Sequence, residues 1–161
     1  RFSIMASEIK VDTIVNAGGD NDTGIDLATN DQILLKVANA TKLTMNSTGQ
    51  TTIVGEGGTT TTSVQQGLAK SWINFVGTGT ISISDSLNFS SINDENTGEY
   101  ALSFTNNMGN ANYAIDTHDK NYGGGWSDSN GTTGFDTRRR SEANAYADAS
   151  QVWASTHGDL A

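Results

Sequence analysis

The stretch "GLAKSWINFVGTGTISISDS", residues 67–86, decides the fold because its glycines allow two interpretations. A phosphate-binding loop places its glycines between a strand and a helix, so that backbone amides and a helix N-terminus converge on the anion. Here residues alternate between polar and apolar both before Gly77 and after Thr80, which is the pattern of a half-buried strand. No third glycine and no Lys-Ser/Thr pair follows. The stretch therefore predicts a β-hairpin that turns at residues 77–80.

Further short strands are predicted in the rest of the C-terminal part, residues 67–161. Brief apolar runs recur there, and turn-forming clusters such as "NDENTG" and "NNMGNAN" separate them. The runs lie at residues 87–89, 100–104, 113–115, 135–139 and 151–154. Together with the hairpin they predict seven short strands, with no apolar pattern of helix length among them, which is typical of a compact antiparallel β-sandwich. A short helical turn is possible before them, at residues 63–69.

The N-terminal part, residues 1–66, has thinner and more polar strands. Between residues 8 and 54, short apolar runs alternate with turn formers at spacings of about 8 to 12 residues. The segment "GEGGTTTTSVQQG", residues 55–67, has lost almost all apolar content, which predicts a joint near Gln66. We expect residues 1–66 to form an attachment region or stalk whose apolar stripe is completed by neighbouring chains. A separate small domain is the alternative.

Composition predicts an all-β chain that assembles with copies of itself. Gly, Ser, Thr and Asn make up more than two fifths of the 161 residues, a mixture that favours turns and strands over helices. Leu, Ile, Val and Phe make up only about a fifth, a share close to that of disordered chains, yet the chain has no proline. A chain with so little apolar surface is stabilised by burying strand faces against its own copies. We therefore expect a homo-oligomer.

Charge and cysteine content disfavour several classes of partner and site. The chain has no cysteine, so disulfides, thiolate metal sites and cysteine nucleophiles are excluded. Its net charge is −9, with only nine Lys and Arg residues, and nucleic-acid binding depends on neutralising phosphates. No apolar run approaches the roughly 20 residues of a membrane span. We expect neither nucleic-acid binding nor membrane insertion.

The hairpin is part of a longer resemblance. "SEIKVDTIVNAGGDNDTGIDLATND" at residues 7–31, the segment 67–115 with its "NTG" and "NANYA", and the closing "HGDL" resemble the short tail-fibre and virion structural proteins of marine bacteriophages. The resemblance implies a trimeric, fibrous or knob-like virion component on the tail, collar or head surface. Its N-terminal part would attach to other virion proteins, and its C-terminal domain would meet the host. Residues 116–150 depart from the pattern, as a variable receptor-facing region would.

The segment "DNDTGID", residues 20–26, resembles a shortened calcium loop. Asp20, Asp22 and Asp26 would supply carboxylate oxygens, and Gly24 would allow the sharp turn. An EF-hand loop also needs a bidentate Glu at its twelfth position, which here is Asp31. A solvated turn is therefore the other interpretation. We expect no cofactor, with calcium at this loop as the alternative.

The segment "HDKNYGGGWSDSNGTTG", residues 118–134, is predicted to be a loop that binds a glycan. Aromatic rings stack on the apolar faces of sugars, while amides and carboxylates hydrogen-bond their hydroxyl groups. The candidate contacts are Asp119, Asn121, Tyr122, Trp126, Asp128 and Asn130. In the alternative interpretation, Trp126 packs against the end of the sandwich or a subunit interface.

The polar residues do not indicate catalysis. His118 and His157 are the only histidines, and neither has a partner at the spacing of a triad or a metal cluster. The carboxylates are scattered through predicted loops, whereas an acid/base pair needs burial to separate its two pKa values. Arg138, Arg139 and Arg140 would alternate across a strand, and in so acidic a chain we expect them to pair with Asp or Glu rather than with an anionic glycan.

These observations predict a non-enzymatic virion structural protein, a tail fibre or appendage that recognises a host-surface glycan through multivalent binding. A capsid decoration or collar protein with a purely structural role is one alternative. A fragment of a polysaccharide depolymerase is the alternative from the enzymatic class.

Overall fold

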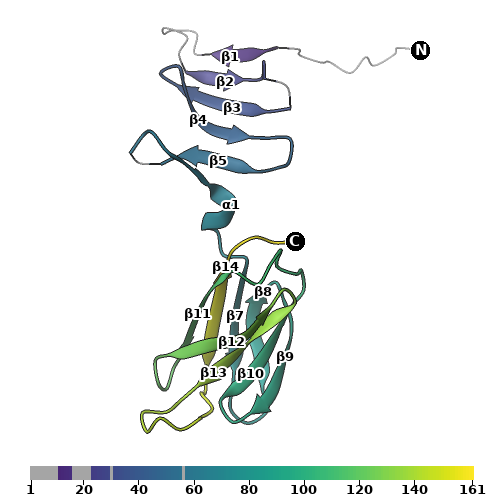
Figure 1. Ribbon diagram of the computed structural model, residues 1–161, viewed down its shortest axis with the longest axis vertical. Helices are drawn as coiled ribbons and strands as arrows, with labels where there is room; N and C mark the ends of the chain where they lie inside the picture. Colours follow the sequence, from purple (N-terminus) through teal and green to yellow (C-terminus); the bar gives the residue numbers. More distant parts are fainter. Residues whose placement is uncertain (1–10, 16–22, 30, 56) are drawn as a thin grey trace, which may run out of the picture. The chain divides into compact units, whose positions relative to one another are not determined.

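The computed structural model describes residues 11–15, 23–29, 31–55 and 57–161. The chain is all-β, its sheets are antiparallel, and it divides into two compact units, residues 1–65 and 66–161 (Figure 1). Among the described residues the single helix is α1 (Val64–Gly67). No helix in those ranges has the length and apolar character needed to cross a membrane.

The first unit is one antiparallel sheet in which every strand pairs with the next along the chain. Figure 1 shows β1 to β5 following one another as a ladder. The strands are β1 (Thr13–Val15), β2 (Gly24–Asp26), β3 (Ile33–Val37), β4 (Ala40–Met45), β5 (Thr51–Val54) and β6 (Thr61–Ser63). Among the described residues of this unit no second layer covers the sheet, and several of its large aliphatic side chains remain exposed.

The second unit is an antiparallel β-sandwich, as the sequence predicts, but its two four-stranded sheets contain eight strands rather than seven. The first sheet has the order β11-β14-β7-β8. It consists of β7 (Ser71–Val76), β8 (Ser82–Leu87), β11 (Ala114–Asp119) and β14 (Val152–His157). The second sheet has the order β12-β13-β10-β9. It consists of β9 (Phe89–Asn96), β10 (Glu99–Phe104), β12 (Gly125–Gly131) and β13 (Gly134–Arg139).

The core of the sandwich lies between the two sheets and is rich in aromatic residues. The rings of Phe75 and Tyr100, one from each sheet, meet edge to face with centroids 5.1 Å apart. Phe104 packs on both Phe89 and Phe135. Edge-to-face and tilted aromatic pairs stabilise a core beyond the area they bury. This cluster explains how a chain with few aliphatic residues builds a compact domain.

The β7–β8 pairing confirms the hairpin expected from residues 67–86. Gly79 has φ of +66°, a left-handed conformation that glycine adopts without strain. Gly77 is needed for a different reason, since a Cβ there would lie 2.6 Å from Tyr100 Oη and 2.8 Å from the carbonyl of Ala149. The Tyr100 hydroxyl also donates a hydrogen bond to Gly77 O at 2.6 Å. Gly77 therefore lets the turn sit against the core.

Candidate functional site

The outer face of the β11-β14-β7-β8 sheet carries two exposed tryptophans. In β7, Ile73 and Phe75 point into the core, so Trp72 points outward with 38% of its surface exposed. In β14 the same alternation leaves Trp153 outward with 37% exposed. Exposed large aromatic side chains on a rigid sheet are uncommon enough to suggest a binding surface.

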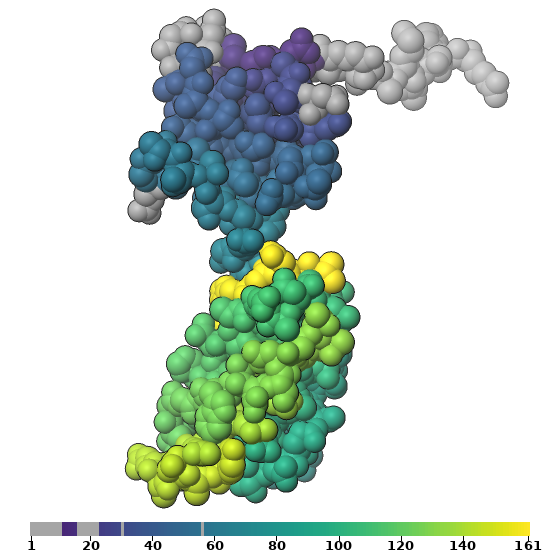
Figure 2. Space-filling view, in the orientation of Figure 1, coloured from purple at the N-terminus to yellow at the C-terminus, as the bar shows by residue number. Residues whose placement is uncertain are grey.

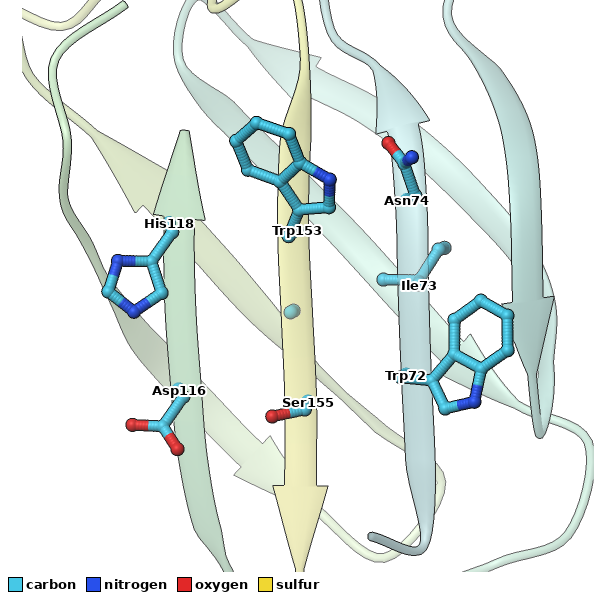
Figure 3. A pocket seen from close by; sticks show the side chains of 8 residues that line it. Trp72, Ile73, Asn74, Asp116, His118, Trp153 and Ser155 are labelled. Carbon is cyan, nitrogen blue, oxygen red and sulfur yellow. The ribbon is translucent and has the colours of Figure 1, made fainter. Parts of the chain in front are cut away.

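Cross-strand pairing gathers polar side chains around the two tryptophans. Trp153 is paired with His118 on one side and with Asn74 on the other. Directly opposed residues in an antiparallel sheet project to the same face. In the next row Ser155 lies between Asp116 and Trp72. The tryptophans therefore occupy diagonal positions in a two-row platform across three strands (Figure 3).

The platform is hollowed rather than flat. An open hollow of about 350 Å³ lies over it. It is lined by Trp72, Asn74, Asp116, His118, Trp153 and Ser155, with Ile73 and Ala154 between them. Its size is at the lower end of the range for small-molecule sites. The lining combines indole faces with amide, imidazole, hydroxyl and carboxylate groups.

Neighbouring residues orient two of the polar groups. Gln151 Nε2 donates a hydrogen bond to Asn74 Oδ1 at 3.0 Å, which leaves the Asn74 amide nitrogen as the donor available to a ligand. His118 Nδ1 lies 3.3 Å from the carbonyl oxygen of Gly123. A carbonyl can only accept, so this hydrogen bond needs a proton on Nδ1, and the Nε2 atom of the ring is the one turned to a ligand. Donors and acceptors thus alternate with aromatic surface, a pattern suited to a polyhydroxylated ligand.

The sequence-predicted glycan loop is not one loop in the structure. Its residues form the end of β11, a turn and the edge strand β12. Asp119 faces inward with no exposed side-chain surface and pairs with Arg139. A carboxylate with no exposed surface does not reach a ligand, so Asp119 is a structural residue. The assignment of residues 118–134 to a loop was wrong because pairing with β13 orders β12 despite its polar composition.

The carboxylate of Asp119 fixes the turn that follows it by accepting hydrogen bonds from backbone amides. Its Oδ1 accepts hydrogen bonds from the backbone of Asn121, Tyr122 and Gly123. Burial alone would raise the pKa of this carboxyl group, but the hydrogen bonds from the Tyr122 amide and from Arg139 outweigh it and hold the pKa below its usual value. The turn is thereby fixed next to His118.

The other predicted contacts are divided between this turn and the opposite sheet. Asn121 Oδ1 accepts hydrogen bonds from the amide and hydroxyl of Ser150, whereas Tyr122 is 38% exposed. Trp126, Asp128 and Asn130 lie on β12, in the sheet whose side faces the viewer in Figures 1 and 2. The structure therefore does not bring Trp126 together with Trp72 and Trp153.

Trp126 belongs to a cluster with its own partners. Its ring lies 6.2 Å from that of Tyr146, and the Arg140 guanidinium lies 5.3 Å from the Trp126 ring and 5.0 Å from the Tyr146 ring. Stacking of a guanidinium on aromatic faces is a stabilising cation–π contact. Trp126 is therefore packed against neighbouring side chains, although 39% of the residue stays exposed.

The arginines alternate as the sequence predicts. Arg139 is buried against Asp119. Arg138, on the outer face, forms ion pairs with Asp128 at 3.1 Å and Glu99 at 3.6 Å. The expectation that arginines of this run pair with Asp or Glu is confirmed for Arg138 and Arg139. Arg140 instead hydrogen-bonds Asn144.

The proposed calcium loop falls largely outside the described residues, because Asp20 and Asp22 are not among them. Asp26 is described, and its carboxylate pairs with Lys36 and accepts a hydrogen bond from the amide of Ala28. The hydrogen bond from Lys36 lowers the pKa of Asp26. Within the described ranges no group of three or more His, Asp or Glu side chains is placed to hold a metal ion.

Sequence reasoning missed the platform, although one signal for it was visible. The alternation of Trp72 and Asn74 against Ile73 and Phe75 indicates a two-faced strand. The second sheet of the sandwich determines which face of this strand is covered. Trp153 and His118 lie side by side only because segments distant in the sequence pair with each other. Comparison with known proteins adds no assignment, since no protein-family model, no curated protein and no solved structure matches the chain.

Proposed function

We propose that this chain binds a glycan through the outer face of the β11-β14-β7-β8 sheet and that binding involves no catalysis. The observation that carries the proposal is the pair of outward-facing tryptophans, Trp72 and Trp153, beside oriented hydrogen-bonding groups. Sugar rings present apolar C–H faces and a rim of hydroxyl groups. Indole rings stack on the C–H faces, and side chains such as Asn74 and His118 form hydrogen bonds with the hydroxyl groups.

The biological setting of the proposal comes from the resemblance to tail-fibre and virion proteins. In that setting the chain is a homotrimeric subunit of a bacteriophage appendage, and residues 1–66 attach it to other virion proteins or serve as a stalk. Each sandwich would bind the host-surface glycan weakly. Several linked copies then bind together because the second contact forms at a high effective concentration.

A purely structural role in a capsid decoration or collar protein is the second candidate. Its supporting observation is the same exposed aromatic face, because tryptophan is also enriched where proteins dock on one another. The two candidates differ in the ligand that the face prefers. With a glycan bound, the side chains of Asn74, His118 and Asp116 would be hydrogen-bonded to its hydroxyl groups. A protein partner would instead bury these side chains at the rim of an interface.

Glycan-array screening of the full chain tests the proposal, followed by titration of the strongest ligand. Trp72→Ala and Trp153→Ala should each weaken binding at least tenfold, about 1.4 kcal/mol, because each removes one stacking surface. Trp126→Ala is the matched control, since it removes an equally exposed tryptophan from the other sheet. Absence of any glycan ligand, or equal loss in all three variants, would overturn the proposal. Capture of a purified virion protein by the same face would favour the structural role.

A further inference from the structure

The floor of the platform is built entirely from strands. All the residues that line the hollow belong to β7, β11 and β14. The turn that follows β11 contacts His118 through the Gly123 carbonyl, but it contributes no residue to the lining. Sites for a single small molecule enclose most of its surface in a concave pocket, whereas side chains on the outer face of a sheet form a floor without end walls. A ligand longer than the platform can therefore continue past it.

The two tryptophans are diagonal neighbours on this floor. Trp153 is directly opposite Asn74, and Trp72 precedes Asn74 by two residues on β7. Diagonal neighbours on one face of an antiparallel sheet are about 7–8 Å apart, against about 5 Å for directly opposed residues. Figure 3 shows the two indole rings standing apart on β14 and β7. Because a sugar ring is similar in size to one indole ring, a single sugar does not stack on both tryptophans.

The surroundings of Trp153 are polar. His118 lies directly opposite it on one side and Asn74 on the other. The Asn74 amide is oriented by Gln151 and the His118 ring by the carbonyl of Gly123. A sugar stacked on Trp153 would therefore have an oriented hydrogen-bonding group on each side. We call Trp153, His118 and Asn74 the polar subsite.

The surroundings of Trp72 are more apolar. Ser155 lies directly opposite it on one side and Leu87 of β8 on the other, and Leu87 is 48% exposed. We call Trp72, Ser155 and Leu87 the apolar subsite. A hydrophobic contact surface discriminates weakly between sugars that differ in one hydroxyl group, whereas a site that hydrogen-bonds that hydroxyl group discriminates strongly. The two subsites therefore differ in the selectivity that they can supply.

We propose that the platform binds an internal stretch of a linear glycan, with one sugar unit stacked on Trp153 and another unit of the same chain stacked on Trp72. The inference rests on the proposed glycan binding and names the form of the ligand, which is a chain rather than a single or terminal sugar. The polar subsite selects the sugar by hydrogen bonds to its hydroxyl groups. The apolar subsite adds affinity for a second unit with little selectivity.

The dependence of affinity on chain length gives the first test. The probes are the members with one to six units of the linear hexose, pentose or N-acetylhexosamine series that the full chain binds most strongly on the array. Affinity should rise about tenfold between one unit and three, because the second stacking contact is gained, and should then stay constant up to six.

Two outcomes of that series separate this inference from the proposed function. Equal affinity for the single sugar and the six-unit chain would overturn the inference and leave glycan binding standing. The same holds if the array shows binding only to the terminal sugars of branched glycans. Absence of any glycan ligand would overturn the proposed function, and this inference with it.

Single substitutions assign the gain to one tryptophan. Trp72→Ala should bind the single sugar as the parent chain does and gain nothing from further units, because the polar subsite is left intact. Trp72→Phe should recover part of the gain, since a phenyl ring still stacks on a sugar. Trp153→Ala should lose binding of the single sugar. Trp126→Ala, on the other sheet, is the matched control and should keep the whole length profile. An unchanged length profile in Trp72→Ala would overturn the inference.

Competition by long chains tests whether the bound stretch is internal. Long and short fragments of the polysaccharide built from the same sugar unit are compared at equal mass, so that the short sample has many more chain ends. Both should compete equally with the six-unit probe, because each internal stretch is a binding site. Competition in proportion to the number of chain ends would show that the platform binds an end and would overturn the inference.

Discussion

Arg139 Nη1 donates a hydrogen bond to Asp119 Oδ2 across 2.7 Å, and neither side chain has any exposed surface. Asp119 ends β11 and Arg139 ends β13, so the pair joins the two sheets of the sandwich. The other carboxylate oxygen holds the turn after β11 through backbone amides. One carboxylate therefore links both sheets and the turn beside the candidate site.

Replacing one member of this buried pair should be strongly destabilising. Asp119→Ala leaves Arg139 charged and without its partner in the interior, and we expect the free energy of unfolding to fall by about 3–5 kcal/mol. Arg138→Ala is the control, because its ion pairs lie at the surface and are expected to contribute about 0–1 kcal/mol. Urea unfolding of both variants measures the difference. Equal losses would show that burial of the pair is not the cause.

The same carboxylate should make the sandwich sensitive to acid. Its pKa is lowered in the folded state, so its contribution to stability is present above the unfolded pKa of about 3.9 and is lost as the pH falls through the folded pKa. The melting temperature of the sandwich should be nearly constant between about pH 7 and pH 5 and fall below about pH 4. Asp119→Asn should show a shallower fall in the same calorimetric series. An unchanged slope would assign acid unfolding to other carboxylates.

Local patterns in the sequence predicted much of the sandwich, and pairing between distant residues explains the rest. The β7–β8 hairpin follows from alternation on both sides of Gly77, a signal contained within one stretch. Strand β12 was missed because its residues Gly125, Asp128 and Asn130 have low intrinsic strand propensity. Strand β12 is ordered because it pairs with β13, and the local sequence pattern does not reveal that partner.

The candidate site depends even more on long-range pairing. The platform exists because β14 lies between β11 and β7, which brings Trp153 between His118 and Asn74. No local pattern fixes the register of strands so far apart in the chain. The predicted site used the aromatic residues that lie close together in sequence, Tyr122 and Trp126, and the structure places Trp126 on the other sheet. The low apolar content of residues 1–66 predicted that their strands would lack a covering layer within one chain. It did not predict which face of that sheet would be apolar.

The two glycines of the β7–β8 turn should differ in their tolerance of alanine. In Gly77→Ala the new methyl group would overlap Tyr100 Oη and the backbone carbonyl of Ala149. We expect a loss of more than about 2 kcal/mol from this overpacking. Gly79 has open space around it and a positive φ, so Gly79→Ala should cost only about 1 kcal/mol through backbone strain. Denaturant unfolding compares them, and a larger loss for Gly79→Ala would contradict the close packing of Gly77.

Tryptophan fluorescence should report glycan binding at the platform without any added label. The chain has three tryptophans, two on the platform and one, Trp126, on the opposite sheet. In Trp126→Phe, addition of the glycan identified on the array should shift the emission to shorter wavelength and reduce quenching by acrylamide, because a stacked sugar removes water from the indole faces of Trp72 and Trp153. The double variant Trp72→Phe and Trp153→Phe retains only Trp126 and should show neither change. A shift in the double variant that is absent from Trp126→Phe would move the binding site to the β12 side of the sandwich.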